Sequence, residues 1–378
     1  MQTFFELLQV AVGHRERLSD APSAREWSEL FDIARRQAVT GMLFETVSRL
    51  PKEQWPPKDV IFKWTVTTEQ IRKQNEKTTA VCGKLTGLLN KDGFDVCILK
   101  GQANHIYYDR FRKGSGNLRT CGDVDAWIKP QERMRHPVRY IIEYFERKRL
   151  IQSLCHLHAE ITPSGNVPIE IHFRPSFLNA PWRDRRFQRL FAGDCLETGT
   201  VDDTNITKLR IDYDLIFQMN HIYRHLIDEG VGLRQVLDYY MLLKAYNEEK
   251  ITSESLMSRE DIRQHIYSCG MRRFSAALMY VLQVVFGMDE SEMLCCPSES
   301  DGQFLLDEIV AAGNFGHYDT RMASIVVRKG KLSYQLQKAR RRFMRNIRFL
   351  TYYPEEVICE PFARIAHFLW RKYKLYRY

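Results

Sequence analysis

Residues 121–130 read CGDVDAWIKP, and the fold is decided here. Asp123 and Asp125 alternate with apolar residues ahead of Pro130, which is the pattern of a β-strand over 123–128. Side chains two apart on a strand share one face, so these carboxylates would lie about 6 to 7 Å apart. Like charges this close repel unless a cation lies between them. A hard divalent ion such as Mg²⁺, which takes oxygen ligands, is the natural partner.

The segments on either side of this stretch also predict strands. Residues 94–99 read FDVCIL directly after an Asp-Gly turn signal, and a short helix over 103–111 follows. Residues 112–117 read RKGSGN, which favours a flexible basic loop. After an amphipathic helix within 131–150, the turn signal PSGN separates two β-rich segments, 156–162 and 167–173.

A third acid, Glu170, lies between two isoleucines in the last of these segments. If this strand lies beside the strand of Asp123, Glu170 completes a three-carboxylate site. Such a site can hold two metal ions roughly 3.5 to 4 Å apart. The alternative is that Glu170 simply faces solvent from its strand.

Helical patterns flank this α/β segment. Within 1–92, apolar residues recur at three- and four-residue spacing, Ser23 and Glu26 form a capping box, and a long helix is expected over 67–90. After residue 184, helices are expected over 212–228, 233–246, 258–268, 272–286 and 301–312. We therefore predict an α+β protein with a small mixed-sheet core. The expected divisions are an N-terminal helical region (1–92), the core (93–183), a C-terminal helical domain (184–320) and a basic helical tail (321–378).

Positive charge is concentrated in the tail. The 378-residue chain has a formal net charge of +9, yet residues 321–378 alone hold 15 Lys and Arg against 3 Asp and Glu. Basic and aromatic residues mix there at helical spacing, a composition that can bind nucleic acid or an anionic membrane surface. The alternative is an ordinary solvated helix face.

The sequence predicts a cytoplasmic protein without a membrane span. The N-terminus lacks a basic segment followed by an apolar core, and the longest mostly apolar stretch, 274–288, is too short to cross a bilayer. The nine cysteines are scattered without paired CxxC knuckles, which favours reduced thiols.

Three histidines, His156, His158 and His172, allow a zinc interpretation, because alternating histidines on a hairpin can converge. No fourth ligand is evident. The preferred interpretation is that His172 supports the acidic site by hydrogen bonding, while His156 faces a nucleotide or packs in the core.

The order of these motifs resembles the nucleotidyltransferase superfamily built on the DNA polymerase β-like palm. The matching motifs are Ile98-Leu99-Lys100-Gly101, Arg119, Gly122-Asp123-Val124-Asp125 and Ile169-Glu170-Ile171-His172. More narrowly, the chain is similar to uncharacterised bacterial nucleotidyltransferases with the pattern LKG...R..GDxD...EIH. The resemblance implies a polymerase β-like palm core, flanked by N-terminal and C-terminal helical regions, in a metal-dependent enzyme.

The resemblance also implies a role for each matching residue. Asp123, Asp125 and Glu170 would be catalytic and would bind Mg²⁺, with Mn²⁺ as an alternative, and Glu170 would assist deprotonation of an acceptor hydroxyl. Lys100 and Arg119 would offset charge on the triphosphate, and Gly101 would let the backbone approach the phosphates. The remaining expected nucleotide contacts are Gln102, Gly122, His156 and His172. The implied reaction transfers a nucleoside monophosphate from an NTP, with ATP as the expected donor, to an unidentified hydroxyl and releases pyrophosphate.

Alternatives remain beside this assignment. Gln102 stands where the superfamily usually has serine or glycine, as expected if the core binds a nucleotide or a partner without catalysis. The basic tail could instead make the protein a nucleic-acid-binding module. The resemblance extends loosely to His221, Arg234 and Asp238, which either belong to the site or connect helices.

Overall fold

The computed structural model describes residues 1–319 and 331–377, which form an α+β protein. Four α-helices precede the first strand: α1 (Gln2–Ala11), α2 (Ala24–Arg36), α3 (Thr40–Val47) and α4 (Lys58–Lys91). The capping box predicted at Ser23 and Glu26 is confirmed at the start of α2. Helix α4 begins well before residue 67, because its first turns bury Trp64 against the aromatic rings of α2.

Five strands form a mixed sheet in the order β1-β2-β5-β4-β3. They are β1 (Phe94–Leu99), β2 (Val124–Pro130), β3 (Ile151–Leu154), β4 (His158–Ser164) and β5 (Val167–His172). Strand β2 is antiparallel to β1 and parallel to β5, and β4 is antiparallel to both β3 and β5. The prediction of a small mixed sheet is confirmed. Strand β3 was missed, because this four-residue edge strand is formed by its pairing with β4 and not by a clear alternation.

Two further local expectations were wrong. The helical region expected after residue 184 contains a separate hairpin of β6 (Leu196–Val201) and β7 (Thr204–Leu209), whose two turn residues have positive φ angles. The segment expected as a flexible basic loop contains a 3₁₀-helix over Ser115–Leu118, with Ser115 and Gly116 buried. A close approach of Gly116 to His105, which leaves no room for a Cβ atom, explains the burial.

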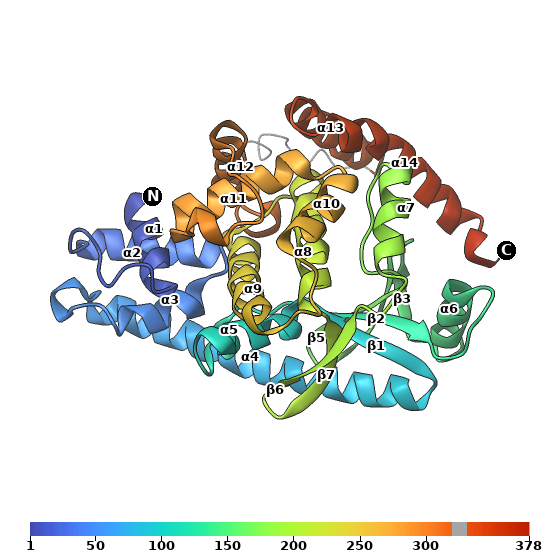
Figure 1. Ribbon diagram of the computed structural model, residues 1–378, viewed down its shortest axis with the longest axis horizontal. Coiled ribbons are helices and arrows are strands. Elements are labelled where there is room, and N and C mark those ends of the chain that lie inside the picture. Colours follow the sequence, from blue (N-terminus) through green and yellow to red (C-terminus); the bar gives the residue numbers. More distant parts are fainter. Residues whose placement is uncertain (320–330, 378) are drawn as a thin grey trace.

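The remaining helices are α5 (His105–Phe111), α6 (Pro137–Arg147), α7 (Pro181–Leu190), α8 (Ile211–Asp228), α9 (Leu233–Thr252), α10 (Arg259–Ser268), α11 (Arg272–Phe286), α12 (Glu299–Ala312), α13 (Lys331–Leu350) and α14 (Pro354–Lys372). Figure 1 shows α4 running beneath the sheet and α8 and α9 standing on its other side. Helices α13 and α14 run along the top and right of the molecule in this view, with α14 close to α7. Residues 320–330, at the junction with the predicted tail, lie outside the described residues. Among the described residues, no helix is both long enough and apolar enough to cross a membrane.

The two faces of the sheet contact different cores. Residues such as Val124, Ala126 and Ile169 belong to one apolar cluster with α4 and α6. The opposite face contributes Leu99 and Trp127 to a larger cluster, which joins the N-terminal helices to α8, α9 and α11. Because side chains alternate along a strand, Asp125 lies on this second face, directed toward the helical region.

Candidate active site

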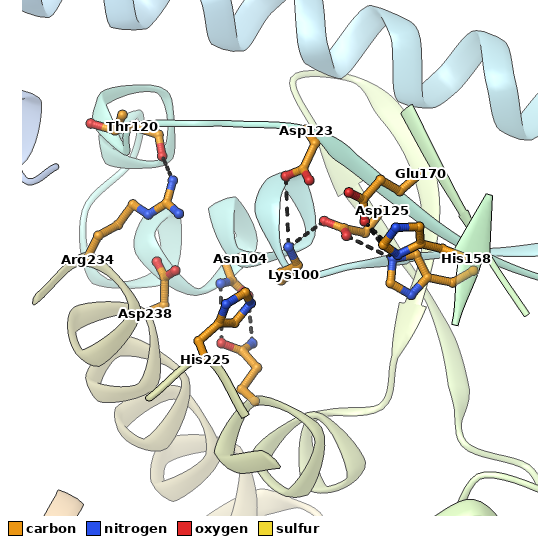
Figure 2. Close-up of polar contacts among 12 residues, drawn as sticks. Lys100, Asn104, Thr120, Asp123, Asp125, His158, Glu170, His225, Arg234 and Asp238 are labelled. Carbon is orange, nitrogen blue, oxygen red and sulfur yellow. Dashed lines mark hydrogen bonds and ion pairs between the residues drawn. The ribbon is translucent and has the colours of Figure 1, made fainter. Parts of the chain in front are cut away.

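The pairing of β2 with β5 brings the predicted acids together. Asp125 lies directly opposite Glu170 in the parallel register, so both carboxylates share the sheet face toward α8. Asp123, two residues earlier, joins them, and the three side chains can each place a carboxylate oxygen within 4.8 Å of the others. Figure 2 shows these side chains converging from neighbouring strands.

A lysine lies between the two aspartates. The Lys100 Nζ atom is 2.7 Å from Asp125 Oδ2 and 3.9 Å from Asp123 Oδ1. Lys100 follows β1 directly and has a φ angle of +44°, a conformation that non-glycine residues rarely adopt. Backbone strain of this kind costs of order 1–3 kcal/mol and is often found at functional sites. The strain therefore supports a functional role for the position of this ammonium group.

Two histidines connect the acids from the other side. His172 Nε2 lies 3.0 Å from Asp125 Oδ1 and 3.3 Å from Glu170 Oε2, while His158 Nδ1 lies 3.1 Å from the same Glu170 oxygen. His172 therefore has the supporting position expected for it. His158, Glu170 and His172 also form a second group that could hold a metal ion, and it shares Glu170 with the carboxylate group.

The electrostatics of the site favour an additional cation. Burial alone would raise the pKa of Asp125, but Lys100 and His172 hold that pKa below its usual range. The charge of Asp125 in turn raises the pKa of Asp123, against the opposing effect of Lys100. Burial would also raise the pKa of Glu170, but its contact with His172 keeps that pKa low. Three carboxylates thus face one ammonium group, an excess of negative charge that a divalent cation would offset.

These groups line a cavity of about 290 Å³ between the sheet and the helical region. The helical wall is formed largely by α8, whose contributing side chains are Phe217, His221, Arg224 and His225. Of these, only His221 was singled out from the sequence. Arg224 and His225 lie three and four residues after His221, so helical spacing alone would have placed them on the same face.

Arg119 does not line this cavity, and its predicted contact with phosphate is not supported. Its guanidinium group makes two hydrogen bonds to the Asp238 carboxylate, of 2.6 and 2.7 Å, and its side chain is only 4% exposed. Arg234, which lies on α9 together with Asp238, donates a 2.9 Å hydrogen bond to the Thr120 carbonyl, as Figure 2 shows. The Asn75 side-chain amide donates to the Arg119 carbonyl from α4. Arg119, Arg234 and Asp238 therefore hold the segment that leads into Asp123.

The other predicted nucleotide contacts have separate positions. The Gln102 side chain is buried and donates to Asn75 O and Thr79 Oγ1, so it is engaged with protein groups. Gly101 has a φ angle of +53° and lies against the Asp123 carbonyl, while a Cβ atom added at Gly122 would meet no other group within 4 Å. His156 lines a second cavity, stacked on His367, and so does not converge with His158 and His172 on one zinc site.

An α+β fold with a carboxylate cluster on one face of a mixed sheet is the arrangement expected of a nucleotidyltransferase-like protein. Residues 23–287 match the family model described as uncharacterised nucleotidyltransferase, and the chain belongs to this family.

Other known proteins add little to this assignment. No curated protein matches the chain. Among solved structures, an antigenic nucleotidyltransferase-like protein from Paracoccidioides brasiliensis is similar over 56% of this chain and 98% of its own, at 13% identity and a TM-score of 0.31. That likeness is too weak to support an inference about this chain.

Proposed function

We propose that this protein is a metal-dependent nucleotidyltransferase with a polymerase β-like palm. In the proposed reaction, an acceptor hydroxyl oxygen forms a bond to the α-phosphorus of an NTP, with ATP as the first candidate. The bond to the leaving pyrophosphate breaks, and the hydroxyl proton passes to a carboxylate. The observation that carries the proposal is the register of Asp125 against Glu170, with Asp123 beside them on a cavity wall.

The donor set fits a hard divalent ion. Asp123, Asp125 and Glu170 offer carboxylate oxygens, the ligands that Mg²⁺ prefers, and Mn²⁺ accepts the same ligands. When bound, the ion would act as a Lewis acid and neutralise charge on the phosphates. Lys100 would add positive charge beside the donor, and His172 would keep Asp125 and Glu170 in position. Glu170 is the carboxylate assigned to accept the hydroxyl proton.

The test is transfer of label from [α-³²P]ATP, together with release of pyrophosphate, by the full chain in Mg²⁺ with a cell extract as the source of acceptors. Asp123→Asn and Asp125→Asn should each lower transfer by about 100-fold or more, because the lost groups act electrostatically on the reacting phosphate. The matched control is Asp95→Asn, which removes an exposed acid from the neighbouring strand β1. Full activity in both cavity variants would remove these acids from the mechanism. ATP binding without any pyrophosphate release would favour the catalytically silent alternative.

A second function, at the C-terminal helices, is favoured by a separate observation. Helices α13 and α14 expose large apolar side chains at helical spacing, among them Phe343 (64%), Ile347 (51%), Phe362 (70%) and Ile365 (59%). Helix α13 contains five arginines, whereas α14 contains two. Exposed apolar side chains beside basic ones fit an anionic membrane surface better than nucleic acid, which offers no apolar phase for the isoleucines.

Sedimentation with vesicles of neutral or anionic phospholipid tests this second function. Phe362→Ser should weaken binding to anionic vesicles, whereas Phe62→Ser, at an equally exposed phenylalanine on α4, should not. Salt-sensitive binding of oligonucleotides that Phe362→Ser leaves unchanged, without vesicle binding, would favour the nucleic-acid module instead.

A further inference from the structure

A second and larger cavity, of about 500 Å³, lies beneath the C-terminal helices. Three arginines line it: Arg342 from α13, and Arg364 and Arg371 from α14. Its opposite wall includes His156 and Phe177, from the segments before β4 and after β5. We call it the arginine cavity.

The arginine cavity adjoins the cavity of the carboxylate site, because the same chain segments line both. His156 lines the arginine cavity, and His158, two residues later, lines the carboxylate cavity. In the same way, Phe177 lines the arginine cavity and Pro175 lines the carboxylate cavity. Helix α8 also contributes to both. Its Arg224 lies 5.1 Å from the centre of the Phe177 ring, which places a cation at the boundary between them.

The charge in the arginine cavity is only partly compensated. Arg364 is held by Asp228, at 3.1 Å, and by Glu360. Within the part of the chain that the structure describes, neither Arg342 nor Arg371 has a carboxylate partner. Lone arginine side chains that face a cavity are suited to phosphate, which they can bind with two parallel hydrogen bonds.

A buried histidine gives an independent sign of a missing ligand. His156 is 8% exposed, and its Nε2 atom has no hydrogen-bond partner among the described residues. Arg174 and Arg224 both act on this histidine through their positive charge. A buried polar atom of this kind ordinarily has a partner. A bound anion with hydroxyl groups would supply one and would lie in a positive field.

We propose that the arginine cavity binds a phosphate group of the acceptor, so that the acceptor is a small phosphorylated compound with a free hydroxyl. This inference rests on the proposed nucleotidyl transfer. The cavity volume suits a small molecule. The position of the cavity favours the acceptor over the donor as its ligand. The cavity lies against the segment before β4, on the side of Glu170, which is the carboxylate proposed to accept the proton of the acceptor hydroxyl. Lys100 and Gly101 lie at the end of β1, on the opposite side of β2.

Calorimetric titration of the full chain tests the proposal, with inorganic phosphate, ribose 5-phosphate and ribose as probes. The double variant Arg342→Gln/Arg371→Gln should weaken binding of both phosphate probes at least tenfold, about the value of one or more hydrogen bonds to a charged group. The matched control, Arg340→Gln/Lys372→Gln, removes the same charge from exposed positions on the same helices that do not line the cavity. It should change these affinities less than about twofold, and ribose should bind none of the three proteins.

The donor is examined separately with a non-hydrolysable ATP analogue and Mg²⁺. Its affinity should be unchanged in the cavity variant, and ribose 5-phosphate should still bind to protein saturated with the analogue. Loss of analogue binding in the cavity variant, or competition between the two ligands, would assign the cavity to the donor and overturn the proposal. Equal losses in both double variants would indicate a diffuse basic surface, such as one for nucleic acid, and would overturn it as well. So would the absence of phosphate binding in the unmodified protein.

These binding measurements are independent of turnover. Asp125→Asn should lower label transfer by about 100-fold or more and leave the binding of ribose 5-phosphate intact. If the unmodified chain binds ribose 5-phosphate through its arginines yet releases no pyrophosphate, the proposed transfer fails while the phosphate site stands. If it transfers label but does not bind the phosphate probes, only the acceptor assignment fails.

Discussion

The ion pair between Arg119 and Asp238 offers a direct test of how the segment before Asp123 is held. Both side chains are about 95% buried, their two hydrogen bonds measure 2.6 and 2.7 Å, and the Tyr108 hydroxyl donates a third bond to Asp238. Burial would raise the pKa of Asp238, but Arg119 keeps it below its usual value, so the carboxylate stays charged. Arg119→Met would leave this charge buried without its partner, which costs about 3 to 5 kcal/mol of unfolding free energy.

Urea unfolding of the full chain measures this cost, provided that the slope with denaturant is unchanged. The control is Arg25→Met, because Arg25 pairs with Glu29 where the two side chains are 89% and 59% exposed. Loss of that pair should cost less than about 1 kcal/mol. The double variant Arg119→Met/Asp238→Leu removes both charges, and it should recover part of the loss seen in Arg119→Met.

The reasoning fails if Arg119→Met is within about 1 kcal/mol of the Arg25 control, the value of an exposed pair. A direct contact between Arg119 and the nucleotide would give a different pattern. ATP binding would weaken in Arg119→Met and would not recover in the double variant, while stability would hardly change.

Three further outcomes follow from the packing and the buried ionisable groups. Gly41→Ala should lower the unfolding free energy by about 1 to 3 kcal/mol, because a Cβ atom there would clash with the Leu118 carbonyl. Gly87→Ala, where a Cβ atom on α4 would meet open space, should raise it by about 0.5 to 1 kcal/mol. Equal effects of the two variants in urea titrations would contradict this reasoning. Burial, aided by Arg119, lowers the pKa of His105 to about 3 from an ordinary 6.5, so stability should fall as pH drops below 6.5, by up to about 1.4 kcal/mol per pH unit, and His105→Gln should flatten that profile. Burial raises the pKa of Glu356 to about 7 from an ordinary 4.5. Its contribution to the free energy of unfolding is therefore full below pH 4.5 and is lost as pH rises through 7. A pH profile of unfolding that Glu356→Gln leaves unchanged would contradict this expectation.

Much of the local structure could be predicted from the sequence. The alternation of Asp123 and Asp125 with apolar residues indicated β2, and FDVCIL indicated β1. The capping box at Ser23 marked the start of α2. Each of these features depends on residues that lie within a few positions of one another in the sequence, so local sequence patterns are enough to reveal them. The edge strand β3 and the hairpin β6–β7 were missed because pairing, and not a strong local pattern, defines them.

The candidate site, too, could be predicted from the sequence only in part. The types and spacing of the acids were apparent from the sequence, and their catalytic role remains a prediction. Three features were not apparent: Arg119 turns to Asp238, the Gln102 side chain is buried against α4, and the C-terminal helices enclose an arginine cavity. Each depends on groups far apart in the chain.

The sequence by itself determined the elements of the core, the face on which Asp123 and Asp125 lie, and the concentration of positive charge in the tail. Only the tertiary structure decided that Glu170 stands opposite Asp125, that Lys100 lies between the aspartates, and that Arg119 serves the fold. The physical reason is that periodicity along a strand or helix sets where a side chain points. Which distant side chain it meets depends on the packing of the whole chain around two apolar cores.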